Sequence, residues 1–520
     1  MRTQLWILGC MVIVVVATSV AQGTRASSHD GITLKEALTR ARVAMFGSDD
    51  EVEEAFEHAR LTGPASLFDM RLVGTIELDR HGRYRAEFAG ELAQIQGYDG
   101  EETWEQSPSG IVRSLEDGNA NFQRMLNWYI TGYWLSARSG IEYIELSSSG
   151  DRDSLGVVID AGHGATATVH LDTDSWLPTS LVTTQFGRQM EVTIEWERRV
   201  GERAIPTSMR VSDDGEPRVS WTLESVEVAD QVPSFSKPRE PLVVEYDRSI
   251  DPALEARRAS GGHIWVRPRI NGQDVGWFLF DTGANGTVID TSVADKLGLP
   301  SFGRIDSTGI GGSKLSEIRR ADSMQLAGVR IADVPLVARD LSHMDRTMGM
   351  DVGGYLGIDL LTHGIIEYDE RDVEIAFHVP DTYELPRGQW VRMPIHNGKP
   401  GVHLEYEGHT GLFVIDTGAP GRMIIGPHVV DRYKLLRNRI TKRTSAFGTG
   451  GSVAARSGAV DGVLWGGQRF DGVPALFLTE HEGAGADILR DGIVGVDLIR
   501  RYVLVFDIAG KRIAYLPHVD

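Results

Sequence analysis

The chain has 520 residues, of which 41% are hydrophobic and 24% are charged, and its net charge is −20. This length is enough for roughly two to four domains, and the composition is that of an ordinary soluble globular protein. Because an acidic surface repels nucleic acid and anionic membranes, we expect neither as a partner. Glycine is frequent, with 59 residues, and clusters in turn-like groups after residue 260. That distribution favours many short strands over long helices.

The N-terminal segment, residues 1–21, has the pattern of a secretory signal peptide. Arg2 supplies a basic start, an apolar run extends from Leu5 to about Ala17, and the segment ends in the small-x-small site Ser-Val-Ala. The run is shorter than the ~20 residues that a spanning helix usually needs. We therefore expect cleavage and a periplasmic or secreted protein. An uncleaved N-terminal anchor is the alternative, and the only membrane attachment that we expect.

The only cysteine, Cys10, lies inside this segment, and apolar residues continue past it, unlike in a lipoprotein signal. The mature protein then has no cysteine, which excludes disulfides, thiol catalysis and cysteine metal sites. No His-Glu-x-x-His motif occurs, and the 15 histidines have no recognised ligand spacing. We expect neither a metal nor a cofactor.

Residues 30–235 are predicted to form one α+β domain. The sequence indicates an amphipathic helix at 31–47 and a second helix at 121–136. Strand-like runs surround these helices and predict one antiparallel sheet with a helix or two packed against it; they occupy residues 70–79, 84–98, 101–106, 165–197 and 219–229. The proline-rich stretch 236–257 is predicted to be a linker.

Beyond the linker the chain repeats itself, and we predict two similar domains at 258–380 and 381–520. Each copy begins with two strands around a tight turn, and the second strand ends at an Asp-Thr-Gly, with Asp281 in the first copy and Asp416 in the second. A Val-Pro pair, a Gly segment ("GYLGIDLL" or "GIVGVDLI") and a closing strand pair follow at nearly equal spacing in both copies.

The duplicated Asp-Thr-Gly indicates a catalytic pair. A single Asp-x-Gly at a strand end is usually a turn residue that bonds its own backbone. At equivalent points of a duplicated domain, however, a pseudo-twofold axis brings both loops together. Two carboxyls that meet cannot both ionise easily, so they share a proton and can hold one water. Asp281 and Asp416 are thus predicted to activate that water for attack on a carbonyl.

Both copies resemble the retropepsin-like aspartyl protease domains of bacterial secreted proteins and retroviruses. The resemblance covers about residues 260–520 and rests on three pairs of segments: Asp281-Thr282-Gly283-Ala284 and Asp416-Thr417-Gly418-Ala419, 355–361 and 493–499, 307–313 and 447–452. It implies a mainly β fold in which two tandem retropepsin-like β-barrel domains form a pseudo-twofold aspartic protease.

The resemblance also implies roles for single residues. Asp281 and Asp416 would be the catalytic pair, and Thr282, Gly283, Thr417 and Gly418 would support their loops. The flaps that cover an extended peptide would have their tips at Gly309, Ile310, Gly311, Gly312, Gly448, Thr449, Gly450 and Gly451. Pro420 stands where the family has a small polar residue, as Asn285 is in the first copy. Equal contribution of the two copies is therefore left open.

Residues 30–235 resemble the periplasmic lipoprotein-carrier (LolA-like) domains in the phrases "GRYRAEF", "GYDGEETWEQSPSG" and "LDTDSWLPTSL". Those domains are curved antiparallel sheets with helices on the concave side. The resemblance implies an apolar groove, and a docking or spacer domain is the alternative.

The sequence thus predicts an exported, single-chain aspartic endopeptidase that acts on a peptide or protein substrate as a monomer. The alternative is a non-catalytic peptide- or lipoprotein-binding protein that keeps the protease fold; the presence of both aspartates argues against it. Pairing of each copy with a second chain is a further alternative, but linked copies have a high effective concentration for each other.

Ala284 and Ala419 follow the glycines, where pepsin-like relatives carry Ser or Thr. Alanine cannot donate a hydrogen bond to the carboxylate, so we predict an activity optimum in the weakly acidic to near-neutral range.

Overall fold

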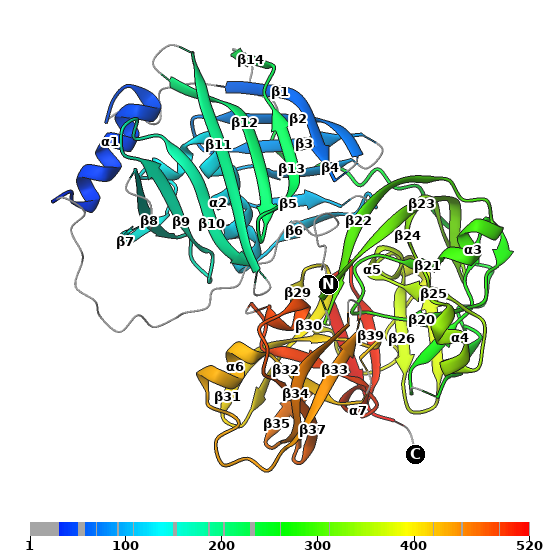
Figure 1. The fold of residues 1–520 in the computed structure, drawn as a ribbon. Coiled ribbons are helices and arrows are strands. Elements are labelled where there is room, and N and C mark those ends of the chain that lie inside the picture. Colours follow the sequence, from blue (N-terminus) through cyan, green and yellow to red (C-terminus); the bar gives the residue numbers. More distant parts are fainter. Residues whose placement is uncertain are drawn as a thin grey trace. The chain divides into compact units, whose positions relative to one another are not determined.

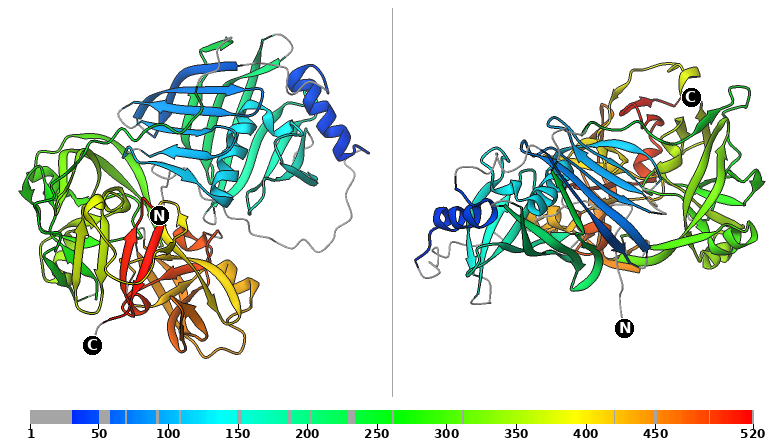
Figure 2. Two further views of the ribbon diagram at one scale, coloured as in Figure 1. Left: turned by 180° about the vertical axis from the view of Figure 1, so that it is seen from behind. Right: turned by 90° about the horizontal axis from the view of Figure 1, so that it is seen from above.

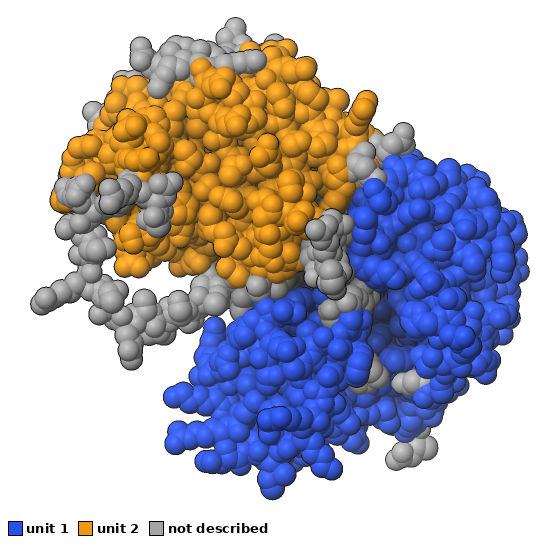
Figure 3. Space-filling view, viewed as in Figure 1, with its two compact units in different colours: residues 1–4, 241–486, 490–520 blue, residues 5–240, 487–489 orange. Residues whose placement is uncertain are grey.

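The computed structural model describes residues 31–49, 58–68, 70–90, 93–107, 109–148, 153–185, 188–200, 203–228, 234–260, 262–310, 312–419, 421–448, 451–487 and 489–518. The predicted signal peptide lies outside them. None of the helices in these ranges is long and apolar enough to cross a membrane. The chain divides into two compact units: Leu5–Glu240 with Asp487–Leu489, and Met1–Gln4 with Pro241–Ala486 and Arg490–Asp520 (Figure 3).

The N-terminal unit is α+β (Figure 1). Its helices are α1 (Leu34–Phe46), α2 (Asp117–Thr131) and the short η1 (Tyr133–Leu135). Its strands are β1 (His58–Leu67), β2 (Met70–Asp79), β3 (Tyr84–Ala89), β4 (Gln94–Tyr98), β5 (Thr103–Gln106), β6 (Val112–Leu115), β7 (Glu142–Ser148), β8 (Ser154–Asp160), β9 (Thr166–Asp172), β10 (Pro178–Gln185), β11 (Arg188–Val200), β12 (Arg203–Asp213), β13 (Glu216–Thr222) and β14 (Ser225–Val228).

These strands form one 14-stranded antiparallel sheet in the order β6-β5-β4-β3-β2-β1-β13-β12-β11-β10-β9-β8-β7, with β14 also paired to β1. The sheet curls around α2 (Figures 1 and 2). Alternating buried and exposed residues explain why these segments are strands with one covered face. Trp104 and Trp134 are fully buried, and the Trp104 indole nitrogen donates to the Phe235 carbonyl at 2.9 Å. The aromatic residues of α2 and η1 therefore belong to the core.

The first copy of the repeat runs from β15 to β27. Its strands are β15 (Val244–Tyr246), β16 (Ala256–Arg258), β17 (Ile264–Val266), β18 (Arg269–Ile270), β19 (Gln273–Asp274), β20 (Trp277–Phe280), β21 (Val288–Asp290), β22 (Ser301–Gly309), β23 (Gly312–Leu326), β24 (Val329–Arg339), β25 (Val352–Leu356), β26 (Ile365–Asp369) and β27 (Glu374–His378). Its helices are α3 (Thr291–Lys296), α4 (Ser342–Met348) and α5 (Ile358–Leu361), and η2 (Pro380–Thr382) follows.

The second copy runs from β28 to β40. Its strands are β28 (Val391–Arg392), β29 (Ile395–His396), β30 (Lys399–Tyr406), β31 (His409–Ile415), β32 (Met423–Ile425), β33 (Lys442–Gly448), β34 (Gly451–Val460), β35 (Val463–Trp465), β36 (Gln468–Phe470), β37 (Val473–Leu478), β38 (Gly492–Val494), β39 (Val503–Asp507) and β40 (Arg512–Leu516). Its helices are α6 (Pro427–Arg432), η3 (Gly483–Ala486) and α7 (Val496–Ile499).

The two copies share a strand topology. In the first, β20 pairs in parallel with β25, β25 antiparallel with β21, and β21 in parallel with β24. In the second, β31, β38, β32 and β37 repeat this pattern. The predicted tight turns are formed by residues with positive φ, such as Asn271 (49°) with Gly272 (74°). In the chain, the hairpin β35–β36 lies between β34 and β37, whereas β24 follows β23 directly in the first copy.

One further sheet joins the copies. Its five strands are ordered β27-β26-β39-β40-β28, so the closing strand pairs of both copies lie in the same sheet. One continuous apolar cluster runs through both copies and includes Phe280 and Tyr368 from the first and Phe413 and Phe506 from the second. The second unit thus has a common core behind its two copies.

Residues 236–257, predicted to be a linker, contribute to the fold of the first copy. Strand β15 pairs with β24, and β16, which begins at Ala256, pairs with β17. Ala253 also forms an isolated bridge with Ala376. Proline removes a donor only at its own position, so the residues between the prolines remain free to pair with an exposed strand edge.

Candidate active site

Each aspartate of the predicted pair follows directly after a buried strand of its copy. Asp281 succeeds β20, and its backbone N–H donates to the Leu356 carbonyl at 3.1 Å. Asp416 succeeds β31, and its N–H donates to the Val494 carbonyl at 3.0 Å. The same parallel strand pairing therefore holds both residues at equivalent places, as the repeat in the sequence predicts.

The structure brings the two carboxyl groups together, and their side chains hydrogen-bond each other. Each carboxyl also lies against the glycine of the opposite loop. A Cβ atom on Gly283 would stand 2.3 Å from Asp416 Cγ, and one on Gly418 would stand 2.5 Å from Asp281 Cγ. Only a residue without a side chain fits at either place. Within its own loop, Gly283 N–H donates to Asp281 Oδ1 and Gly418 N–H to Asp416 Oδ1, both at 2.8 Å.

Thr282 and Thr417 cross-link the two loops below the carboxyls, and both are fully buried. Thr282 N–H donates to Thr417 Oγ1 at 3.0 Å, and Thr417 N–H donates to Thr282 Oγ1 at 3.1 Å. Each hydroxyl in turn donates across to a carbonyl of the other copy, Ile415 at 2.7 Å and Phe280 at 2.6 Å. This reciprocal network fixes the separation of the aspartates.

Burial and nearby charges act on both carboxyls of the pair. Burial raises the pKa of Asp281 well above its usual value, and the neighbouring Asp416 carboxyl raises it further. Burial also raises the pKa of Asp416, but its hydrogen bond from Gly418 and the charges of Lys399 and Arg490 oppose that rise. Two buried carboxyls in contact cannot both ionise easily, so the arrangement favours one proton shared between Asp281 and Asp416.

Three basic residues that the sequence analysis did not single out lie near the pair. Lys399 lowers the pKa of both aspartates, and Arg490 lowers that of Asp416. His263 lies close enough to Asp416 to feel its charge, although burial is the larger effect and lowers the pKa of His263. The duplication could have indicated two of them, because His263 and Lys399 occupy equivalent positions near the start of the first strand of each copy's strand pair. The pairing of Trp265 with Leu279 and of Gly401 with Val414 shows this equivalence.

The loop of the first copy has a buried support. Thr287 N–H and Oγ1 donate to Asp359 at 2.7 and 2.6 Å, and Gly357 N–H donates to Thr287 Oγ1 at 3.1 Å. Burial raises the pKa of Asp359 to about 6, against the opposing effect of these hydrogen bonds. In the second copy Asp497 occupies the equivalent place. It is more exposed and is paired with Arg500 at 2.6 Å.

The predicted flap residues lie at the tips of two hairpins. In the first hairpin, β22–β23, Gly309 pairs with Gly312 around Ile310. In the second hairpin, β33–β34, Gly448 pairs with Gly451. A Cβ atom on Gly448 would stand 3.4 Å from Ile310 Cβ, so the two tips adjoin. The remaining predicted positions, Gly311, Thr449, Gly450 and Pro420, lie outside the described residues.

Within the described ranges, one group of residues has the mutual distances of metal ligands: Asp369, Asp372 and His518. Asp369 Oδ1 already accepts from the backbone N–H groups of Arg371 and Asp372 at 2.9 and 3.0 Å, as in an ordinary turn. We assign no metal to this group.

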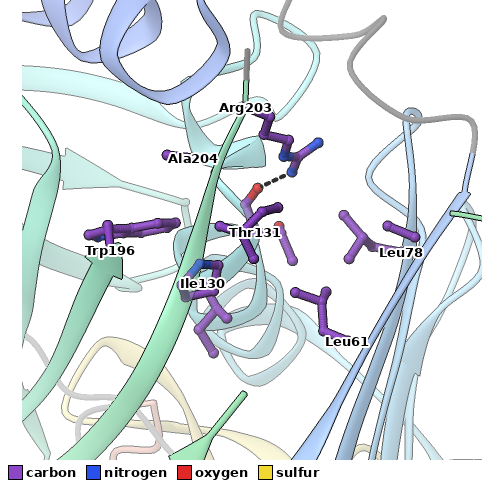
Figure 4. Close-up of a pocket in the computed structure, with 10 residues that line it drawn as sticks. Leu61, Leu78, Ile130, Thr131, Trp196, Arg203 and Ala204 are labelled. Carbon is purple, nitrogen blue, oxygen red and sulfur yellow. Dashed lines mark hydrogen bonds between the residues drawn. The ribbon is translucent and has the colours of Figure 1, made fainter. Parts of the chain in front are cut away.

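The N-terminal unit contains a small, mainly apolar cavity between the end of α2 and the sheet (Figure 4). Leu61, Leu78, Ile130 and Trp196 line it, and Arg203 closes one side by donating to the Thr131 carbonyl at 2.5 Å. Burial lowers the pKa of Arg203 to about 9. The cavity has room for little more than a water molecule, so the apolar groove implied by the lipoprotein-carrier resemblance remains a prediction.

The family model described as aspartyl protease matches the chain twice, at residues 266–360 and 402–498. A search of curated protein sequences found no match. The two matched stretches contain the two Asp-Thr-Gly loops and both hairpins. The protein is therefore mainly β, with a tandem of protease-like domains, and the family match supports a protease-type function.

Proposed function

We propose that this protein is an exported aspartic endopeptidase that hydrolyses peptide bonds with Asp281 and Asp416. The observation that carries the proposal is the direct contact between the two carboxyls, which the threonine network holds at equivalent places of the two copies. Two buried carboxyls that share one proton can serve as acid and base in the same step.

The proposed mechanism follows from where the proton and the charge lie. A water molecule bound between the carboxyls attacks the carbonyl carbon of the peptide, and the ionised carboxyl takes one proton from that water. The protonated carboxyl gives its proton to the carbonyl oxygen, which yields a neutral tetrahedral diol. The carboxyl that took the proton of the water then gives it to the peptide nitrogen, while the other carboxyl takes a proton from a diol hydroxyl. The C–N bond breaks, a carboxylic acid and an amine are released, and the pair again holds one proton. No covalent enzyme intermediate forms.

The two hairpin tips supply the cover for an extended substrate. Their glycines leave backbone N–H and C=O groups accessible, and a peptide that lies under them can add to the hairpins as a further strand. Because both copies come from one chain, we expect the protein to act as a monomer.

A second candidate is a non-catalytic protein that binds peptides or lipoproteins and keeps the protease fold. The curved sheet of the N-terminal unit, as in the lipoprotein-carrier domains that residues 30–235 resemble, supports a binding role for this unit. We propose that this unit docks or recruits the substrate. Both aspartates and the network around them are intact, which favours the enzyme over the binding protein.

The test uses the protein without residues 1–21 and a diverse peptide library at a series of pH values, with and without pepstatin. Cleavage is read by mass spectrometry. The wild type should cut peptides and pepstatin should reduce the cutting, whereas Asp281→Asn and Asp416→Asn should each lose activity and keep the circular dichroism spectrum. Equal turnover in either variant would contradict the pair as the catalytic group.

A further inference from the structure

Charge is unevenly distributed along the second copy. Residues 432–460, from the end of α6 to the end of β34, contain seven Lys or Arg residues and no Asp or Glu. The whole chain, in contrast, has 73 acidic and 53 basic residues and a net charge of −20. We call residues 432–460 the basic segment; the structure describes all of it except residues 449 and 450.

Four cations of the basic segment are exposed and make no ion pair or side-chain hydrogen bond with another residue that the structure describes: Lys434, Arg437, Lys442 and Arg443. Arg439, in contrast, pairs with the Glu407 carboxylate. Arg456 donates to the Thr441 hydroxyl at 2.7 Å. Because even paired cations on a protein surface contribute little to stability, the four exposed cations are not explained by folding.

The two most exposed large apolar side chains among the described residues belong to the same segment. Ile440 is 96% exposed and Phe447 is 77% exposed. Ile440 precedes β33, and Phe447 lies near the end of that strand, at the tip of the hairpin β33–β34 (orange in Figure 1). Exposed apolar groups add nothing to the core, and their grouping with cations indicates an interaction surface.

The geometry of the strand turns Phe447 away from the core. The preceding residue, Ala446, is buried in an apolar cluster with Val453. Successive side chains of a strand point to opposite faces, so Phe447 belongs to the outer face of the hairpin. On that face, four residues earlier in the strand, Arg443 stands opposite Arg456. Like charges that face each other destabilise a hairpin, so the stability of the hairpin does not account for this face.

The equivalent hairpin of the first copy, β22–β23, has a balanced charge. Its strands contain four Lys or Arg and three Asp or Glu residues. Arg319 pairs with Asp295 at 3.1 Å, and Arg320 pairs with Asp333 at 3.3 Å. Among the described residues of these two strands, none is an exposed large apolar side chain. This fold therefore forms such a hairpin without exposed lone cations and without an exposed aromatic residue.

Exposed cations beside exposed apolar side chains match the chemistry of an anionic membrane surface. There Lys and Arg meet the negative headgroups, and aromatic or aliphatic side chains enter the interface. Seven residues separate Ile440 and Phe447, which is at most ~24 Å of extended chain. A folded acidic partner would need a fitted pocket for each of them, whereas a membrane offers one continuous surface. The separation therefore favours a membrane over an acidic protein.

We propose that the basic segment docks on the surface of a membrane that contains anionic lipid. Phe447 and Ile440 enter the interface, and the four exposed cations face the headgroups. The net charge of the chain predicts repulsion from such a membrane, but the local charge reverses that effect at this segment. The inference goes beyond the proposed function and does not depend on it, because the aspartate pair takes no part in the docking.

The first experiment measures binding to lipid vesicles by co-sedimentation. It uses the protein without residues 1–21, because that apolar segment would itself insert into a membrane. Vesicles of phosphatidylcholine alone are compared with vesicles that contain about one third phosphatidylglycerol. The protein should bind the anionic vesicles at least about tenfold more tightly, and added NaCl should weaken the binding. Equal binding to both kinds of vesicle, or binding to neither, would overturn the inference.

A set of charge variants locates the docking surface. Replacing the four exposed cations by Gln should lower the affinity for the anionic vesicles about 100-fold or more, since each contributes about fivefold. The matched control makes the same change in net charge at four exposed cations of the first copy: Arg257, Lys296, Lys314 and Arg346. The control should lower the affinity less than about threefold. Equal losses would mean that the basic segment is not the docking surface.

The apolar residues distinguish a membrane from an acidic polypeptide. Phe447→Ser and Ile440→Ser should each weaken vesicle binding about tenfold, because each loses apolar area that leaves water. Leu464→Ser, at an exposed position of the second copy outside the basic segment, is the control and should bind as the wild type does. Circular dichroism checks that each variant is folded.

Polyglutamate is the probe for an acidic polypeptide. Binding of polyglutamate as tightly as of anionic vesicles, together with vesicle binding that Phe447→Ser leaves unchanged, would indicate a site for polyanions in general and overturn the inference. Vesicle binding is measured without any peptide cleavage. Failure of the proposed function would therefore leave this result standing, and a protein that cleaves peptides but binds no vesicles would defeat only this inference.

Discussion

At the scale of single residues, Gly283 and Gly418 allow the carboxyls to meet. Because a Cβ atom at either place would stand within 2.5 Å of the opposite carboxyl, alanine must displace one loop. A displacement of about 1 Å at reacting groups can cost ~100-fold in rate. We therefore expect Gly283→Ala and Gly418→Ala each to lower kcat/KM by about that factor. Gly272→Asn, in an exposed turn where asparagine tolerates positive φ, is the control and should retain activity.

A second residue-scale prediction concerns Lys399, whose charge lowers the pKa of both aspartates. Lys399→Met removes that charge, so both pKa values should rise. The pH at which the pair loses its shared proton, and the pH at which it gains a second one, should both move upward. The measurement is a pH profile of kcat/KM on one cleavable peptide, beside Lys434→Met as a surface control. Movement toward lower pH would contradict the placement of Lys399 beside the pair.

Replacing Ala284 or Ala419 by serine should shift the pH profile of kcat/KM in the opposite direction. A serine at either place can donate to the adjacent carboxylate and favour its charged form. Ala284→Ser and Ala419→Ser should therefore move the acidic limb to lower pH. The unmodified protein, whose aspartates both have raised pKa values, should have its optimum in the weakly acidic to near-neutral range. An optimum near pH 2–3, or no shift in either variant, would refute this reasoning.

The proposed catalytic aspartates could be predicted from the sequence because the duplication places one Asp-Thr-Gly motif at the same position of each copy. It could also have indicated His263 and Lys399, which stand at equivalent places ahead of the two loops. Arg490 could not be found in that way. It lies just ahead of β38, after a stretch that contains the short η3, whereas the first copy has the helix α4 between β24 and β25. The matched Gly segments put the uncharged Val352 at the equivalent place of the first copy, so the duplication gives no signal for Arg490.

At the scale of elements, the neighbouring residues predict the helices and turns better than they predict the strands. Thr33 caps α1 by accepting from Glu36 N–H at 3.2 Å, and Gly47 ends it with a φ of 83°. Strands β1, β6, β7, β8 and β12 were not predicted. Strand β7 is largely exposed and lies at the end of the sheet order, so no alternating apolar pattern marks it. Such segments become strands because they pair with strands that are distant in the sequence, and the local pattern does not show this.

The buried support of the first loop gives an element-scale prediction. Asp359→Ala leaves Thr287 N–H buried without its acceptor, which should cost about 1–3 kcal/mol of the free energy of unfolding. Asp497→Ala is the matched control in the second copy. Its partner Arg500 is exposed, so the loss should stay below about 1 kcal/mol. Urea denaturation of both variants measures the difference, and equal losses would mean that the two loops are supported alike.

At the scale of the whole second unit, the shared sheet and core predict that the two copies unfold together. Phe506 is fully buried in the cluster that spans both copies. Phe506→Ala should cost about 3–5 kcal/mol of the free energy of unfolding. Hydrogen exchange should then quicken in β20 and β26 of the first copy as much as in β31 and β39 of the second. The exposed Leu464→Ala is the control. Faster exchange confined to the second copy would contradict a common unfolding unit.

The pairing of both copies within one polypeptide has a consequence for inhibitors. When a protease is assembled from two identical chains, every substitution appears on both sides, and a twofold-symmetric compound matches it. Here each side is encoded separately, and the two copies have already diverged, because His263 stands in the first copy where Lys399 stands in the second. A symmetric compound must therefore fit one side poorly. An inhibitor whose two ends differ should therefore bind in a single orientation, and exchanging its two ends should weaken it.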